Sequence, residues 1–319
     1  MGDGCGGRAG RKILSFFDLN MQKVKINISP RVSSDKDGYC RLLNIYQQVR
    51  GLENCKIIFD FQNTSWFEAN LAAIFGVIGD YASAKGNSLS ITGMRGNIEN
   101  ILQRNGFMSE YGMWKEADTY GTTISYKKFN PEQGTQFSQY IKNELLSKPD
   151  FPMLSRLLAK KINESIYELF ENARTHGKCN HIYTCGQYYP NKRPARIDIT
   201  IVDLGVSIKK NVNSYLRKNG KSVKNGPEAI AWAIQKGNTT KTGNISGGLG
   251  LDLVLEFLKQ NKGKIQIVSS NGYWEFRNDK VDMDILEDIF HGTIVNIEFN
   301  LDDQSYYQLS EEISLDGIF

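Results

Sequence analysis

The stretch ELFENARTHG, residues 168–177, places a carboxylate at Glu168 and a carboxamide at Asn172 inside an amphipathic run. Residues four apart share one face of an α-helix, so the two side chains are expected to point the same way. A carboxylate can orient and deprotonate a water or a hydroxyl, and an amide oxygen can coordinate Mg²⁺, which prefers oxygen ligands. Taken alone, the pair is more typical of a solvated helix face.

A second segment, IDITIVDLGVSI at residues 197–208, makes a functional interpretation of this pair more plausible. A β run ends in Asp203, and Gly205 follows two residues later. A carboxylate fixed at a strand end can accept a hydrogen bond from an exocyclic amine such as that of adenine. A glycine beside it lets a planar base approach the backbone.

The third segment is KGNTTKTGNISGGLGL, residues 236–251, a Gly/Ser/Thr loop that runs into a helix. Backbone amides in such a loop can face phosphates, and the helix N-terminus adds partial positive charge. The segment lacks the GxxxxGK[ST] pattern, so it is not a P-loop. The residues expected to contact or close over phosphates are Thr239, Thr240, Lys241, Gly247, Gly248 and Gly250.

Together with HGTIVNIEF at 291–299, these segments resemble in order and type the Bergerat-fold (GHKL) ATPases, the superfamily of DNA gyrase and the histidine kinases. ELFENARTHG resembles the N box, DLGVSI the first glycine box, and TTKTGNISGGLGL the lid and second glycine box. The resemblance spans about 151–300. It is closest to the anti-sigma-factor serine kinases, which share Glu-x-x-x-Asn-Ala followed by His-Gly, and Thr-Thr-Lys before the glycine box.

This resemblance implies ATP and Mg²⁺ as cofactors, with Glu168 as general base and Asn172 as the Mg²⁺ ligand. It implies that Asp203 reads the adenine amine with Gly205 beside it. One position departs from the pattern: Ser207 stands where the first glycine box usually has its second Gly, and a Ser does not freely adopt φ > 0. The other implied nucleotide-binding residues are Thr240, Lys241, Gly247, Gly248, Leu249, Gly250 and Thr293.

The first half of the chain resembles a STAS domain, the fold of anti-sigma-factor antagonists. The resemblance rests on the strand that ends in Asp60, the helix after it, the next strand and the helix end LQRNGF. The alignment places Glu68 at the acidic position of that family and Ala69 where its phosphorylated Ser stands. Because Ala has no hydroxyl, the resemblance implies a domain that is not regulated by phosphorylation there.

The predicted fold class is therefore α/β, with a STAS-like α/β domain at 21–129 and a Bergerat-fold α/β sandwich at 151–305. A polar linker with a short helix is expected at 130–150, and a tail at 306–319. Residues 1–20 are interpreted as a disordered arm or a misassigned start. In the second half, a helix is expected at about 153–176 and strands at HIYTCGQYY, RIDITIVD, GKIQIVSS, GYWEF and TIVNIEF.

The composition narrows the function classes. A net charge of +4 without a basic block makes nucleic acid an improbable partner. Five cysteines without CxxC indicate reduced thiols and a cytoplasmic location, and no apolar run approaches a membrane span. Three functions stay open: an ATP-binding regulator of protein–protein contacts with slow hydrolysis, a serine/threonine kinase that acts on a separate protein, and a non-catalytic ATP-dependent scaffold.

Overall fold

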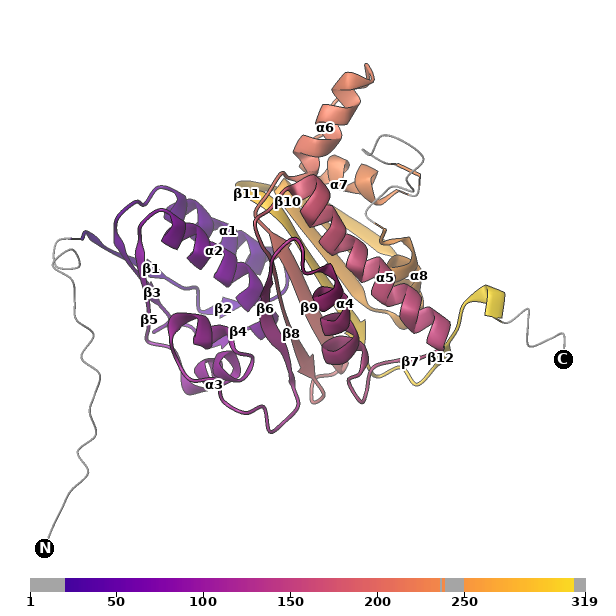
Figure 1. The fold of residues 1–319 in the computed structure, drawn as a ribbon, viewed down its shortest axis with the longest axis horizontal. Helices are drawn as coiled ribbons and strands as arrows, with labels where there is room; N and C mark the ends of the chain where they lie inside the picture. Colours follow the sequence, from indigo (N-terminus) through magenta and orange to yellow (C-terminus); the bar gives the residue numbers. More distant parts are fainter. Residues whose placement is uncertain (1–20, 236, 239–249, 313–319) are drawn as a thin grey trace, which may run out of the picture.

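The computed structural model describes residues 21–235, 237–238 and 250–312 of this mixed α/β protein (Figure 1). The first half contains a parallel three-stranded sheet in the order β1-β3-β5 and a parallel two-stranded pair, β2-β4. The strands are β1 (Lys23–Asn27), β2 (Arg31–Val32), β3 (Lys56–Asp60), β4 (Trp66–Phe67) and β5 (Ser88–Thr92), and the helices are α1 (Lys36–Arg50), η1 (Ala69–Leu71), α2 (Ala72–Ala84), α3 (Gly96–Arg104) and η2 (Phe107–Tyr111).

The second half is built on an antiparallel five-stranded sheet in the order β10-β11-β9-β8-β6. A parallel two-stranded pair, β12-β7, lies apart from it. The strands are β6 (Thr123–Phe129), β7 (Met153–Leu154), β8 (Ile182–Tyr189), β9 (Arg196–Asp203), β10 (Lys264–Arg277), β11 (Lys280–Asn300) and β12 (Tyr306–Tyr307).

One face of the five-stranded sheet is covered by helices of the second half. In α5, Ser155 caps the N-terminus by accepting a hydrogen bond from the backbone N–H of Leu158 at 3.0 Å, and an apolar stripe from Leu158 to Phe170 turns toward the sheet. The helices are α4 (Gly134–Tyr140), η3 (Ile141–Leu146), α5 (Arg156–Asn172), η4 (Ala173–Gly177), α6 (Ile208–Lys218), α7 (Gly226–Ile234) and α8 (Asp252–Asn261).

The other face of the sheet is covered by α1 and α2 of the first half. In α1, Asp35 caps the N-terminus, and the buried side chains of Tyr39, Leu43 and Tyr46 face the same way. One hydrophobic cluster contains these residues together with Phe290 of β11. The order of layers is thus sheet, helices, sheet, helices (Figure 1). The two halves share a core instead of being separated by an open gap.

Two boundaries differ from those expected from the sequence. The domain predicted at 21–129 includes the segment 123–129, but this segment forms β6, which pairs with β8 at the edge of the second sheet. The supposed linker at 130–150 contains α4 and η3, whose side chains Phe137, Ile141 and Leu145 are fully buried in the second core. Its many polar residues lie on the outer side of these helices, which is why the composition resembled that of a linker.

A buried polar network joins the halves. The Glu68 carboxylate, at 4% exposure, accepts a hydrogen bond from Arg196 of β9 at 2.7 Å. Asn70 Nδ2 lies 3.0 Å from both Thr200 Oγ1 and Asn296 Oδ1. Arg196 Nε also lies 3.0 Å from the Asp198 carboxylate. Since buried polar groups are costly unless they are paired, this network fixes how the first half sits on the sheet.

The helices of the described residues include none with both the length and the apolarity that crossing a membrane requires.

We expect Arg196→Ala to lower the free energy of unfolding by about 3–5 kcal/mol, because it leaves buried carboxylates without their cation. Urea unfolding of the full chain measures this. Lys36→Ala is the matched control: it removes an ion pair of 2.8 Å with Asp284 that is nearly half exposed, so its effect should stay below about 1 kcal/mol. Equal effects of the two variants would contradict a structural role for the network.

Candidate functional site

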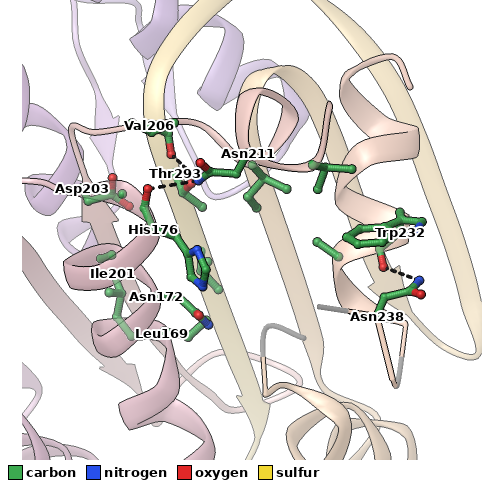
Figure 2. Close-up of a pocket in the computed structure, with 16 residues that line it drawn as sticks. Leu169, Asn172, His176, Ile201, Asp203, Val206, Asn211, Trp232, Asn238 and Thr293 are labelled. Atoms are coloured by element: carbon green, nitrogen blue, oxygen red, sulfur yellow. Dashed lines mark hydrogen bonds between the residues drawn. The ribbon is translucent and has the colours of Figure 1, made fainter. Parts of the chain in front are cut away.

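An open cavity lies on the helix-covered side of the second sheet, among α5, α6, α7 and the ends of β9 and β11 (Figure 2). Most of its wall is apolar, with a few polar side chains. The lining residues are Leu169, Asn172, Ala173, His176, Gly177, Ile201, Asp203, Val206, Ile208, Asn211, Val212, Trp232, Ala233, Asn238, Thr293 and Val295.

Asp203 is the buried acid of this cavity. It ends β9 and is paired with Ile182 on one side and Thr293 on the other, so its backbone is fixed by both neighbouring strands. The side chain is 5% exposed, and Oδ1 has no hydrogen-bond partner among the described residues. Burial raises the pKa of Asp203 to about 7, against the effect of a backbone hydrogen bond from Thr293. A ligand N–H group would satisfy this oxygen.

Two glycines pack where the loop after β9 crosses the end of η4. The backbone N–H of Val206 donates to the Gly177 carbonyl at 2.7 Å. A Cβ at Gly205 would stand 2.7 Å from the Gly177 carbonyl carbon, and a Cβ at Gly177 would stand 3.1 Å from Asp203 Oδ1. Gly205 therefore permits backbone packing and does not line the cavity, whereas Gly177 leaves the space beside Asp203 Oδ1 free of a side chain. The sequence instead predicts that Gly205 lets a planar base approach the backbone.

The structure separates the two residues of the opening motif. Asn172 is the last residue of α5 and lines the cavity, whereas Glu168, one turn earlier, is exposed and lies outside the lining. Glu168 instead adjoins Gly250, where an added Cβ would overlap its carboxylate and where φ is +66°. Gly250 is thus favoured as glycine on two grounds. The geometry brings Glu168, the predicted general base, next to Gly250 of the predicted phosphate-binding loop.

Ser207 adopts φ −63° and ψ 155° and caps α6, accepting a hydrogen bond from the backbone N–H of Lys210 at 3.4 Å. Ser207 therefore does not adopt the left-handed backbone conformation that would favour a glycine at this position. Asn211, which lies one turn further along α6, donates from Nδ2 to the carbonyl oxygens of His176 at 3.0 Å and Val206 at 3.4 Å (Figure 2). The helix is thereby tied to both glycine-containing segments.

Thr293 faces the cavity from β11, and its hydroxyl lies 3.1 Å from Ser269 Oγ. The same Ser269 Oγ accepts a hydrogen bond from the backbone N–H of Ile208 at 2.9 Å and donates to Gly292 O at 2.7 Å. The structure therefore brings together Asn172, Asp203 and Thr293 of the predicted site. The predicted residues Thr239, Thr240, Lys241, Gly247, Gly248 and Leu249 lie outside the described part of the chain.

Several cavity residues were not predicted from the sequence. Trp232 and Ala233 come from α7, and Val206, Ile208, Asn211 and Val212 from the loop and helix after β9. The signals for these elements were available: Asn225 and Glu228 form a capping box at the start of α7, and Ser207 begins α6. What the sequence lacked was any indication that these helices pack beside the strand end.

The described residues contain no group of three or more His, Cys, Asp or Glu side chains that could hold a metal ion by itself. Mg²⁺ is commonly held by one or two protein oxygens together with ligand phosphates, and the Asn172 amide oxygen is suited to that mode. In comparisons with known proteins, the chain matches no protein-family model and no curated protein.

The role of Ser207 can be tested by two substitutions. Because its φ is negative, Ser207→Ala should destabilise the protein by about 0.5–2 kcal/mol through loss of the cap, and Ser207→Gly by only a few tenths. Thermal and urea unfolding measure both variants. If Ser207→Gly stabilised the protein instead, Ser207 would occupy a strained backbone conformation that glycine relieves, and its role as a cap would be refuted.

Proposed function

We propose that this chain is an ATP-binding regulatory protein with a Bergerat-fold ATPase unit and a STAS-like unit. The observation that carries the proposal is the unpartnered, buried Asp203 oxygen on the wall of an apolar cavity. Such an acceptor is expensive to bury and is satisfied by an amine on a flat, otherwise apolar ligand. The adenine ring has this chemistry.

The remaining residues fit the rest of such a ligand. Thr293, which pairs with Asp203 across the strands, places a hydroxyl group on the cavity wall, and apolar side chains such as Ile201 and Trp232 provide surfaces for a ring. Asn172 stands at the end of α5, where its amide oxygen can hold a cation that neutralises phosphates. Bound Mg²⁺–ATP would supply the transferable phosphoryl group. Glu168 would then orient a water or a protein hydroxyl and accept its proton on the carboxylate.

The arrangement of the halves favours a regulator over a kinase that acts on its own STAS-like unit. Ala69, at 2% exposure, begins η1, which packs on β8 and β9 from the side opposite the helices. The cavity lies on the other face of the same sheet. The position that corresponds to the phosphorylated Ser therefore lacks a hydroxyl and is also shielded from the site. A kinase activity would require a separate protein substrate.

Asp203 predicts how nucleotide affinity depends on base and pH. Removing the amine acceptor by Asp203→Asn should weaken ATP binding at least tenfold, and inosine triphosphate, which lacks the amine, should bind the wild type weakly. The carboxyl group loses its proton as pH rises through about 7. Ionised Asp203 accepts the amine hydrogen better, so ATP affinity should rise about tenfold between pH 6 and pH 8.

Calorimetric titration measures these affinities. Because inosine triphosphate carries the same phosphates as ATP, the pH dependence of its binding corrects for their ionisation. Asp282→Asn, a substitution of an exposed acid away from the cavity, is the control and should leave affinity unchanged. Equal affinities for ATP and inosine triphosphate in the wild type would contradict the role of Asp203 as the base-reading residue.

Glu168→Gln should reduce phosphate release from ATP by about 10²-fold or more while leaving ATP affinity within about twofold, because it removes only the proton acceptor. Glu164→Gln changes an exposed acid one turn earlier on α5 and serves as the matched control. Release of γ-labelled phosphate from the purified protein supports the ATPase, and label on a lysate protein supports the kinase. Wild-type turnover in Glu168→Gln would refute the role proposed for Glu168.

A further inference from the structure

A second concave site lies where the two halves meet, on the face of the five-stranded sheet that the first half covers. Its walls come from α1 and α2 of the first half, and from β6, β8, β11 and the loop after β9 in the second half. Its volume is about 630 Å³, within the range of about 300–1,000 Å³ that is typical of small-molecule sites. We call this site the inter-half groove. Because both halves line it, a ligand bound there would contact both.

Aromatic rings make up much of the groove wall. The Tyr46 ring centroid lies 5.3 Å from that of Tyr81 and 6.2 Å from that of His291. Along the second half, the His181 ring lies 6.1 Å from that of Tyr183. Tyr46 and Tyr183 are buried, so neighbouring side chains hold these rings in place. A flat ligand ring can pack against such a wall, and imidazole groups can donate hydrogen bonds to it.

Asp80 is the one acid among the residues that line the groove, and its charge is already engaged. Its carboxylate accepts a hydrogen bond from the Tyr183 hydroxyl at 2.6 Å and another from the Lys128 ammonium group. Partial burial lowers the pKa of the nearby His181, and Lys128 lowers it further against the opposing effect of Asp80. Asp80 therefore holds two side chains of the wall in place and leaves no unpaired carboxylate for a cationic ligand.

The part of the groove around His291 has cations without a neighbouring acid to neutralise them. Partial burial lowers the pKa of His291, and Arg50 and Lys210 lower it further. Neither these two cations nor the two histidines of the groove form an ion pair with any described residue. A concave surface with unneutralised positive charge around it attracts anions.

We propose that the inter-half groove binds an aromatic phosphate monoester. The ring of this ligand packs on Tyr46 and Tyr81, and its phosphate accepts hydrogen bonds from the imidazole N–H groups of the groove. A phosphate monoester suits the site better than a carboxylate does. It carries a charge of about −1.5 to −2 at neutral pH and three strong acceptor oxygens, so it can meet donors from several strands at once.

The groove and the candidate nucleotide cavity share one loop. Leu204 and Gly205 line the groove, whereas Asp203 and Val206 line the cavity on the other face of the sheet. A ligand in the groove would therefore contact the backbone that positions Asp203. Binding in the groove does not require nucleotide in the cavity. The proposal can stand if the proposed function fails, and the reverse also holds.

Histidine NMR of the full chain without nucleotide tests the proposal, because the chain has only three histidines, His176, His181 and His291. Phenyl phosphate is the probe, and His→Gln variants assign the signals. When the probe binds, the pKa of both His181 and His291 should rise by about 1, since an opposite charge within about 4–6 Å favours the protonated imidazole. His176 lines the candidate cavity and should not respond. Inorganic phosphate and phenol should each bind more weakly than phenyl phosphate.

Two neighbouring lysines provide a matched pair of variants for calorimetric titration with phenyl phosphate. Lys128→Gln removes a cation from the groove wall and should weaken binding about tenfold, as expected for loss of a hydrogen bond to a charged group. Lys127→Gln changes an exposed lysine outside the lining and should leave the affinity unchanged. Circular dichroism checks that both variants are folded.

Four results would overturn the proposal. The first is the absence of saturable binding of phenyl phosphate, and the second is a response of His176 alone, which would place the anion in the candidate cavity. The third is equal weakening by Lys128→Gln and Lys127→Gln, which would indicate non-specific attraction to the surface. The fourth is equal affinity for phenyl phosphate and inorganic phosphate, which would exclude an aromatic ligand.

Discussion

Burial of both faces of the five-stranded sheet is the constraint on which the rest of the structure depends. Antiparallel sheets often leave one face in water, but here helices cover one face and the first half covers the other. Because side chains alternate along a strand, each central strand carries two separate sets of contacts. In β9, Ile197, Ile199 and Ile201 face the helices, while Arg196 and Thr200 face the first half.

That alternation links the candidate site to the join between the halves. Asp203 ends the same strand on the cavity side, only three residues beyond Thr200, which bonds to Asn70 of the first half. On the neighbouring strand, Thr293 faces the cavity and Asn296 bonds to Asn70. A displacement of these strands would therefore alter both the cavity and the contacts with Asn70 of the first half. This gives a physical route by which ligand binding and contacts of the first half can affect each other.

The buried charges explain why the halves are held in one orientation. Burial, together with neighbouring Glu298, raises the pKa of Asp198, and Arg196 opposes that effect. Lys264 in turn lies 3.0 Å from the Glu298 carboxylate. Separating the halves would expose these charged side chains to water. It would also expose a large apolar core that spans both halves. The apolar contacts hold the halves together, and the polar contacts set their register.

The local features of the fold can be predicted from single segments of the chain. Apolar alternation placed β8 and β9, and the helical stripe placed α5. These elements follow from periodicity and from short-range geometry, which a single segment can encode. The resemblance of several segments to family motifs named Asn172, Asp203 and Thr293 as candidates, and the structure brings all three to one cavity.

Which surfaces meet depends on how the segments pack in three dimensions. In the structure, β6 pairs with the second sheet, and Gly205 packs against the backbone of Gly177. Glu168 lies beside Gly250 and outside the cavity. The first half also buries the polar side of RIDITIVD, which includes Asp198 and Thr200. Such outcomes depend on contacts between residues far apart in the chain, and those contacts leave no periodic signal in either segment.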